Sequence, residues 1–178
     1  MLATDGRILG KSSGNLNNKK NFNFSIIIFF LLEQFEAACP NQEPIDIYPF
    51  AFRTHTHKFG QVVTGYRIDH NTGKWEMIGK GDPQKPQMFY PIKKPITVRE
   101  GDWVAARCTM YNFQDQTVRI GSTGDDEMCN FYIMYYVDRM DHILERKVCF
   151  SAGPPYYYWK FDINVPKIVD MEASERLA

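Results

Sequence analysis

The pattern of apolar and polar residues predicts short β-strands. Residues 48–57 are rich in aromatic and β-branched side chains and are bounded by turn-forming residues, which is the composition of a strand. Side chains alternate between the two faces of a strand. One face is therefore predicted to carry Ala51, Arg53, His55 and His57. The opposite, mostly apolar face is predicted to carry Phe50, Phe52, Thr54 and Thr56.

A second stretch, residues 128–136, has the same strand composition. Alternation places one chemically mixed set of side chains on one face: Met128, Asn130, Tyr132 and Met134. The other face is predicted to carry Cys129, Phe131, Ile133 and Tyr135. The acidic run just before it, residues 125–127, is predicted to be a solvated turn rather than an acid–base pair.

The rest of the pattern extends the same architecture. Residues 61–68 and 74–79 predict two strands joined by a hairpin turn, and residues 103–111 predict another strand. Residues 80–95, rich in Lys, Pro and Gln, predict a long surface loop. Short strands separated by turns, without alternating helices, predict an all-β fold, an antiparallel β-sandwich or jelly roll.

The two mixed faces carry candidate metal ligands. Residues of a strand that share a face lie roughly 6.5–7 Å apart, and an imidazole nitrogen binds a metal at about 2 Å, so His55 and His57 can reach one ion. The alternative is a pair of exposed histidines. Met128 either fills a gap in the core or supplies a thioether, a soft ligand that suits Cu(I). His70 and His142 are expected to be surface residues.

Composition excludes some classes of function. The net charge is zero and there is no basic cluster, so no nucleic-acid partner is expected. The four cysteines, Cys39, Cys108, Cys129 and Cys149, include no Cys-x-x-Cys pair, which argues against a zinc knuckle or a thioredoxin-like site. An even count suits a secreted disulfide framework, with reduced buried thiols as the alternative. The sequence alone permits three pairings.

The chain is predicted to have three parts: a leader (1–32), one domain (33–163) and a tail (164–178). Residues 1–21 are polar and predicted to be disordered. The apolar run that follows, residues 22–32, is too short to span a membrane. It is either the apolar core of a signal peptide or a segment foreign to the domain.

Four blocks resemble the copper type II ascorbate-dependent monooxygenases. They are residues 50–57 (Phe-Ala-Phe-Arg-Thr-His-Thr-His), 62–67 (Val-Val-Thr-Gly-Tyr-Arg), 101–108 (Gly-Asp-Trp-Val-Ala-Ala-Arg-Cys) and 126–136 (Asp-Glu-Met-Cys-Asn-Phe-Tyr-Ile-Met-Tyr-Tyr). Their order fits the second of the family's two copper domains. Arg53 and the run from Asn130 to Met134 resemble the family's peptidylglycine-hydroxylating branch.

The resemblance implies copper ligands, substrate contacts and disulfides. His55, His57 and Met128 would bind one copper ion, and the substrate would contact Arg53, Asn130, Tyr132 and Met134. The implied disulfides are Cys39–Cys149 and Cys108–Cys129.

The resemblance also implies an activity. The activity is hydroxylation of the glycine α-carbon of glycine-extended peptides, the first step of peptide amidation, with molecular oxygen and with ascorbate as reductant. This chain would be the oxygen- and substrate-binding half, and the family's N-terminal copper domain would be its partner. The expected location is the secretory pathway, in a secretory granule or outside the cell. The alternative is a secreted copper- or peptide-binding β-sandwich without turnover.

Overall fold

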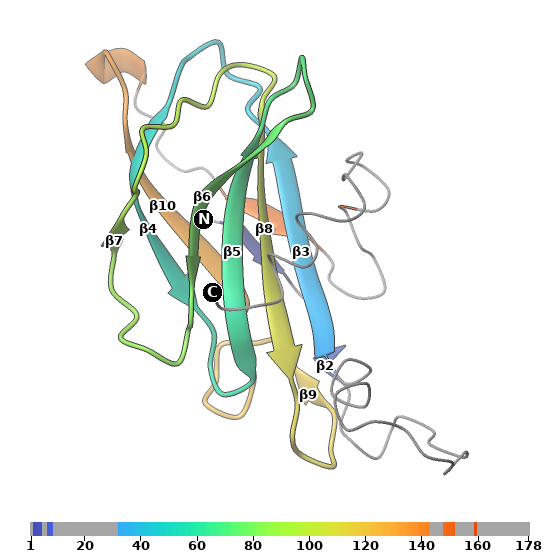
Figure 1. The fold of residues 1–178 in the computed structure, drawn as a ribbon. Coiled ribbons are helices and arrows are strands. Elements are labelled where there is room, and N and C mark those ends of the chain that lie inside the picture. The colour runs from blue at the N-terminus through green and yellow to red at the C-terminus, as the bar shows by residue number, and fades with distance from the viewer. Residues whose placement is uncertain (1, 5–6, 9–31, 143–147, 152–158, 160–178) are drawn as a thin grey trace.

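The computed structural model describes residues 2–4, 7–8, 32–142, 148–151 and 159, and its regular structure is almost entirely β (Figure 1). The 3-10 helix η2 covers Met140–His142. The strands are β1 (Leu2–Thr4), β2 (Arg7–Ile8), β3 (Leu32–Pro40), β4 (Tyr48–His55), β5 (Gly60–Ile68), β6 (Trp75–Gly81), β7 (Tyr90–Pro91), β8 (Trp103–Tyr111), β9 (Val118–Arg119), β10 (Asn130–Tyr136) and β11 (Cys149–Ser151).

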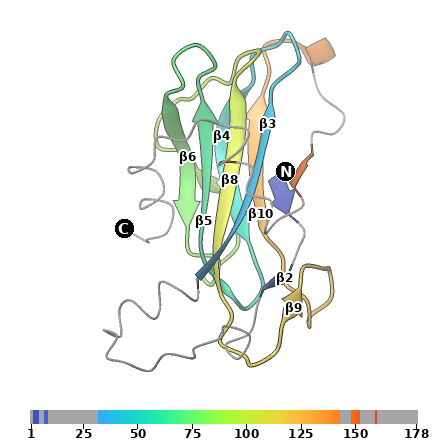
Figure 2. The same cartoon turned by 90° about the vertical axis from the view of Figure 1, so that its right-hand side faces the viewer.

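Two sheets pack face to face. One has the strand order β3-β8-β5-β6 and the other β11-β1-β10-β4-β7, while β2 and β9 form a small separate ladder. Figure 2 shows the four-stranded sheet in front of β4 and β10. The pairings are antiparallel except that of β1 with β11. The predicted all-β sandwich is therefore confirmed.

The centre of the core is a pair of stacked rings held over two glycines. Phe52 of β4 and Phe131 of β10 lie with ring centroids 5.6 Å apart. Gly65 of β5 pairs with Gly79 of β6. A Cβ at Gly65 would come within 2.2 Å of the Phe131 ring, and one at Gly79 within 2.4 Å of the Phe52 ring. The two glycines therefore form the notch that lets the sheets close on these rings.

Two disulfides connect the sheets, with the pairing implied by the family resemblance. Cys108 of β8 bonds to Cys129, which lies just before β10. Cys39 of β3 bonds to Cys149 of β11. One bond therefore links β3 to the edge strand β11 of the other sheet, and the other links β8 to the residue just before β10. The structure contains the predicted disulfide framework.

The outer face of the four-stranded sheet carries a buried ion pair. Arg107 Nε donates to Glu36 Oε1 at 2.9 Å, and both side chains are buried. The Trp159 ring covers this pair, with the Arg107 Cζ 4.1 Å from its centroid, and Trp159 N–H donates to Glu36 Oε2. The ring removes the pair from water, so the pair depends on its mutual hydrogen bonds.

Several local predictions differ from the structure. Residues 2–4 and 7–8, predicted to be disordered, form β1 and β2, and β3 has no counterpart among the predicted strands. The predicted loop 80–95 contains the end of β6 and all of β7. Phe50, predicted on the mostly apolar face with Phe52, is 46% exposed, because the register between β4 and β10 shifts beside it.

Other predictions fall wholly or partly outside the described residues. The apolar run that begins at residue 22 is described only at Leu32, and the tail beyond residue 163 is not described. The domain boundaries remain a prediction. Within the described ranges, no helix has the length and apolar character needed to cross a membrane.

Candidate metal centre

The end of β4 and the segment before β10 bring the candidate ligands together. The strands pair in register, with Asn130 opposite His55 and Tyr132 opposite Arg53. This pairing carries Met128, two residues before Asn130, to the end of β4. His55 Nε2 lies 3.3 Å from Met128 Sδ. Two donor atoms bound to one ion at about 2.0–2.4 Å stand roughly 3–4 Å apart, so this spacing suits a shared metal.

His57 reaches the same place from beyond the end of the strand. β4 ends at His55, so the prediction that both histidines lie on one strand is wrong for His57, which sits in a bend. Its ring centroid nevertheless lies 5.4 Å from that of His55, with the two ring planes nearly perpendicular. The bend therefore brings the two rings together at the end of the strand.

One nitrogen of each imidazole is already occupied. His57 Nδ1 lies 2.8 Å from the carbonyl oxygen of Asp126, and His55 Nδ1 contacts Gln87 Oε1. Because both partners are acceptors, each Nδ1 must carry the proton, and each Nε2 keeps its lone pair. Hydrogen bonds of this kind orient metal-binding histidines in known sites.

Glu127 holds the two arms of the site in place. Its side chain is fully buried and accepts hydrogen bonds from three backbone N–H groups, those of His57, Phe59 and Met128. One carboxylate therefore accepts hydrogen bonds from the backbone of both ligand-bearing segments. These bonds fix the position of His57 relative to Met128. The predicted solvated turn is therefore wrong for Glu127, although Asp125 is exposed.

Two glutamines of the loop after β6 tie that loop to the site. Gln84 Nε2 donates to the carbonyl oxygens of His57 and Gly60, at 2.8 and 3.0 Å. Gln87 Nε2 donates to the carbonyl oxygens of Thr56 and Pro83, at 2.8 and 2.7 Å. Sequence alone does not mark these residues, because a glutamine in a polar loop has no local pattern that distinguishes it from a solvated one.

The donor set is two imidazoles and one thioether. Across the described ranges, no three His, Cys, Asp or Glu side chains gather as a metal-binding cluster, and the further donor atom beside the two imidazoles is the Met128 sulfur. Imidazole suits copper, and thioether selects Cu(I) over harder cations. The residues present therefore fit a copper ion better than zinc, calcium or magnesium.

A cation and two polar side chains continue the same face of the sheet. The Arg53 Cζ lies 5.4 Å from the Tyr132 ring centroid, and Asn130 Nδ2 lies 3.2 Å from the Tyr132 hydroxyl. Arg53 Nε is buried without a hydrogen-bond partner, and no ion pair to Arg53 is found in the described part of the chain. A buried guanidinium N–H without a partner is unfavourable, and an acceptor placed beside it would complete its hydrogen bonding. Met134, farther along the face, is 42% exposed.

Of the other two histidines, His70 lies apart from this face, beside Asp102, and His142 has no described side chain. His70 is exposed, as predicted, and its N–H and its Nδ1 both lie 3.1 Å from Asp102 Oδ1. Burial alone would raise the pKa of Asp102, but hydrogen bonds from Arg99, His70 and Arg67 outweigh it and lower that pKa. The His142 side chain is outside the described residues.

Residues 31–162 match the family model "Copper type II ascorbate-dependent monooxygenase, C-terminal domain". This match covers most of the chain. The chain belongs to this family.

Curated relatives of this copper monooxygenase domain carry names from the peptide-amidating branch. Peptidyl-glycine alpha-amidating monooxygenases A and B of Xenopus laevis are 43% and 42% identical over 138 and 137 residues, which is 76% of this chain in each case. Peptidylglycine alpha-amidating monooxygenase of Rattus norvegicus is 48% identical over 96 residues, 52% of this chain. The matched region is 14%, 15% and 10% of these relatives, so the chain spans about a seventh or less of their length.

Proposed function

We propose that this domain is the oxygen- and substrate-binding half of a peptidylglycine monooxygenase. It would hold one copper ion through His55, His57 and Met128 and hydroxylate the glycine α-carbon of glycine-extended peptides. The observation that carries the copper site is the meeting of His55 Nε2 and Met128 Sδ at 3.3 Å, beside the ring of His57. The names of the relatives, all amidating monooxygenases, support the reaction.

Arg53 is the proposed anchor of the peptide's terminal carboxylate. Its Nε is buried without a partner, on the face of the sheet that carries His55, so a carboxylate there would complete its hydrogen bonding. Asn130 and Tyr132 lie alongside and can donate to the same carboxylate, while Met134 offers an apolar contact. These residues would hold the terminal glycine beside the proposed copper ligands.

The protein's residues and the metal have separate tasks in this proposal. Bound copper supplies the oxygen chemistry of the hydroxylation, with electrons from ascorbate. Gln87 and Asp126 orient the imidazoles, and Glu127 fixes the spacing of the two ligand-bearing segments. A three-ligand set leaves positions for oxygen. The partner in the complete enzyme would be the family's N-terminal copper domain, which would pass the second electron.

The two disulfides support a location in the secretory pathway, in a granule or outside the cell. Amidation suits such a place, because it removes the terminal charge of a peptide and so changes what a receptor recognises.

X-ray absorption at the copper edge tests the metal site. The chain loaded with Cu(I) should bind about one equivalent and show a sulfur scatterer. Met128→Ile should abolish the sulfur signal while nitrogen scatterers remain. Met134→Ile is the matched control, since Met134 lies on the same face but is not a proposed ligand. Sulfur scattering that survives in Met128→Ile would contradict the assignment.

The peptide half of the proposal is tested by binding a labelled glycine-extended peptide. A charge-assisted, two-point contact contributes about 1.5–3 kcal/mol, so Arg53→Lys should weaken binding by roughly ten- to a hundredfold. Copper affinity should change much less. If the same peptide with an amidated terminus bound as well as the free acid, Arg53 would not be a carboxylate anchor.

A further inference from the structure

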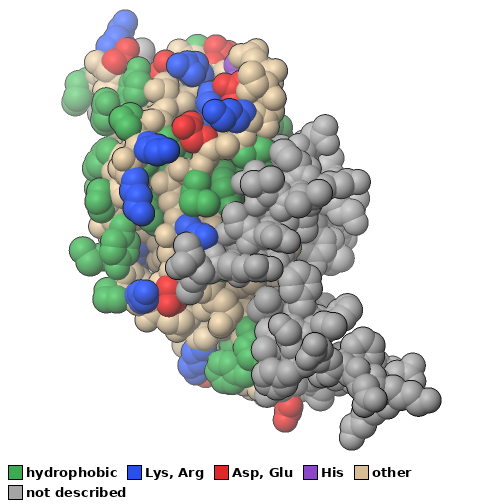
Figure 3. Space-filling view, viewed as in Figure 1, with side chains coloured by type: hydrophobic (Ala, Val, Ile, Leu, Met, Phe, Trp, Pro, Cys, Tyr) green, Lys and Arg blue, Asp and Glu red, His purple; other side chains and the backbone are tan. Residues whose placement is uncertain are grey.

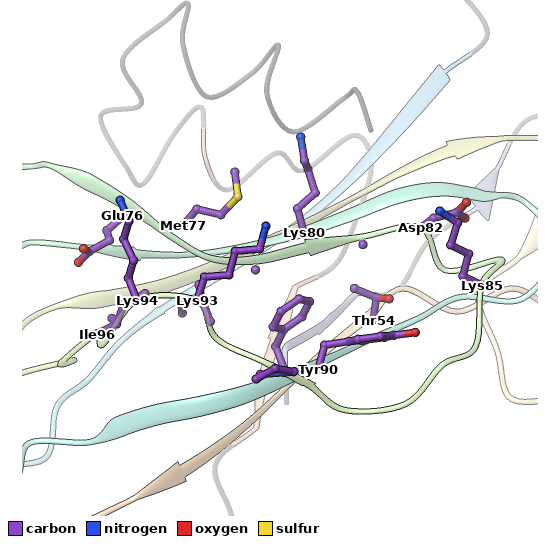
Figure 4. Close-up of a pocket in the computed structure, with 15 residues that line it drawn as sticks. Thr54, Glu76, Met77, Lys80, Asp82, Lys85, Tyr90, Lys93, Lys94 and Ile96 are labelled. Carbon is purple, nitrogen blue, oxygen red and sulfur yellow. The ribbon is translucent and has the colours of Figure 1, made fainter. Parts of the chain in front are cut away.

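A pocket of about 930 Å³ opens at the edge of the sandwich, where β6 of one sheet faces β4 and β7 of the other (Figure 4). It uses the inner side of β4, through Phe52 and Thr54, whereas Arg53 and His55 belong to the opposite side of that strand. The pocket is therefore separate from the proposed copper site. Nothing in the proposed hydroxylation uses it.

The inside of the pocket is apolar. Phe52 and Tyr90 line it with ring centroids 6.3 Å apart, and Ile78 and Ile96 lie behind them, both buried. Met77, at the outer side, is 40% exposed. Along β6 the lining runs from residue 76 to residue 82, which is roughly 20 Å at the rise of a strand. An elongated apolar body fits this shape better than a single ring does.

The rim of the pocket is positively charged at one end. Figure 4 shows Lys93 and Lys94 beside Glu76 and Met77, with Lys85 at the other end beside Asp82. The Glu76 carboxylate lies 3.9 Å from Arg67 Nη1, so its charge is already shared with a residue outside the pocket. Lys93 and Lys94 are both exposed. Their end of the rim therefore carries a net positive charge, and Lys80 adds another between the two ends (Figure 4). The face of the molecule in Figure 3 carries basic and apolar side chains interspersed.

We propose that this pocket binds a long-chain carboxylate. The carboxylate lies between Lys93 and Lys94, and the acyl chain lies over Phe52 and Tyr90, along β6. An apolar interior with a few convergent polar groups is the usual composition of a small-molecule site. The alternative role of these lysines is to protect an exposed sheet edge from pairing with other chains. That role predicts no preference for an anionic ligand over a cationic ligand of equal chain length.

Titration calorimetry with dodecanoate, below the concentration at which it forms micelles, tests the proposal on the full chain. Dodecanoate should bind saturably with one molecule per chain. Acetate, which lacks the chain, and dodecyltrimethylammonium, which reverses the charge, should bind at least about tenfold more weakly. Equal binding of the cation, or tighter binding of the ring-shaped anion cholate, would overturn the assignment of a long-chain carboxylate.

Paired variants locate the binding. The double variant Lys93→Glu and Lys94→Glu should weaken dodecanoate by about tenfold, because both favourable charge contacts become repulsive. Lys74→Glu, an exposed lysine outside the pocket, is its control. Met77→Trp should narrow the groove and weaken binding, whereas Met88→Trp, at an exposed position that does not line the pocket, should not.

All five positions are exposed, so the variants should unfold at the temperature of the parent chain, which melting curves check. Dodecanoate binding that is saturable but unchanged in both pocket variants would place the ligand elsewhere and overturn the proposal. None of the substituted residues is a proposed copper ligand or substrate contact, so the outcome is independent of the proposed hydroxylation.

Discussion

At the scale of residues, the site depends on a carboxylate that is not itself a proposed ligand. Glu127 accepts hydrogen bonds from the backbone N–H groups of Phe59 and Met128, which are about 70 positions apart in the sequence. A buried carboxylate gains enough to offset its desolvation only when its oxygens are bonded in this way. The proposed copper ligands His57 and Met128 are therefore positioned by their backbones.

Glu127→Gln should destabilise the fold and loosen the site together. The amide keeps one acceptor but turns an NH₂ group toward backbone N–H groups, so at least one donor loses its partner. Loss of charge-assisted hydrogen bonds should lower the free energy of unfolding by about 1.5–3 kcal/mol. Urea unfolding of the variant and the parent chain measures this difference. Copper affinity should fall as well. Asp125→Asn, at the exposed neighbour, is the control, and equal stability of both variants would refute the anchoring role.

At the scale of elements, close approach of the sheets depends on small residues in β5 and β6. The stacked rings of Phe52 and Phe131 occupy the space that side chains at Gly79 and Gly65 would fill. The same packing sets the height of β4 and β10 above the other sheet. Since Arg53 and the proposed ligands project from the opposite side of these strands, the core packing also sets the geometry of the site.

Gly65→Ala should cost about 1–3 kcal/mol, because the added Cβ meets the buried Phe131 ring and overpacks the core. Gly124→Ala is the matched control: nothing lies within 4 Å of its Cβ, so the change should be neutral or slightly stabilising. Urea unfolding of both variants measures the difference. A Gly65→Ala protein as stable as the control would mean that the sheets can separate without loss.

At the scale of the whole molecule, the proposed reaction needs more electrons than one copper site can store. Hydroxylation takes two electrons per turnover, and a single copper ion stores one. The chain has four histidines, and two of them belong to the proposed site. Only His70 and His142 remain, and two histidines cannot form a second three-histidine site.

The isolated chain should therefore hydroxylate poorly, although it should bind copper and peptide. The measurement is ascorbate-driven oxygen consumption with a glycine-extended peptide, first with this chain alone and then after addition of a separately expressed N-terminal copper domain of the family. Rescue is the expected outcome. Brisk turnover by the chain alone would refute the electron count. No activity with both domains would favour a copper- or peptide-binding module without turnover.

What the sequence determined by itself was local. Alternation of side chains along a strand is a steric property of the extended backbone, so residues 52–55 and 129–132 could be assigned to faces without knowledge of their partners. The strand 103–111 and the hairpin before it followed from the same composition rules. The disulfide pairing came from the family resemblance, since spacing left three choices.

Only the tertiary structure decided what lies between distant segments. The burial of Glu127, the attachment of Gln84 and Gln87 to the site, and the insertion of β1 beside β10 each join residues tens of positions apart or more. The exposure of Phe50 depends on a register shift that arises only when β10 pairs with β4. Such contacts depend on how two sheets pack, and packing is set by the whole core, so no short stretch of sequence carries the signal.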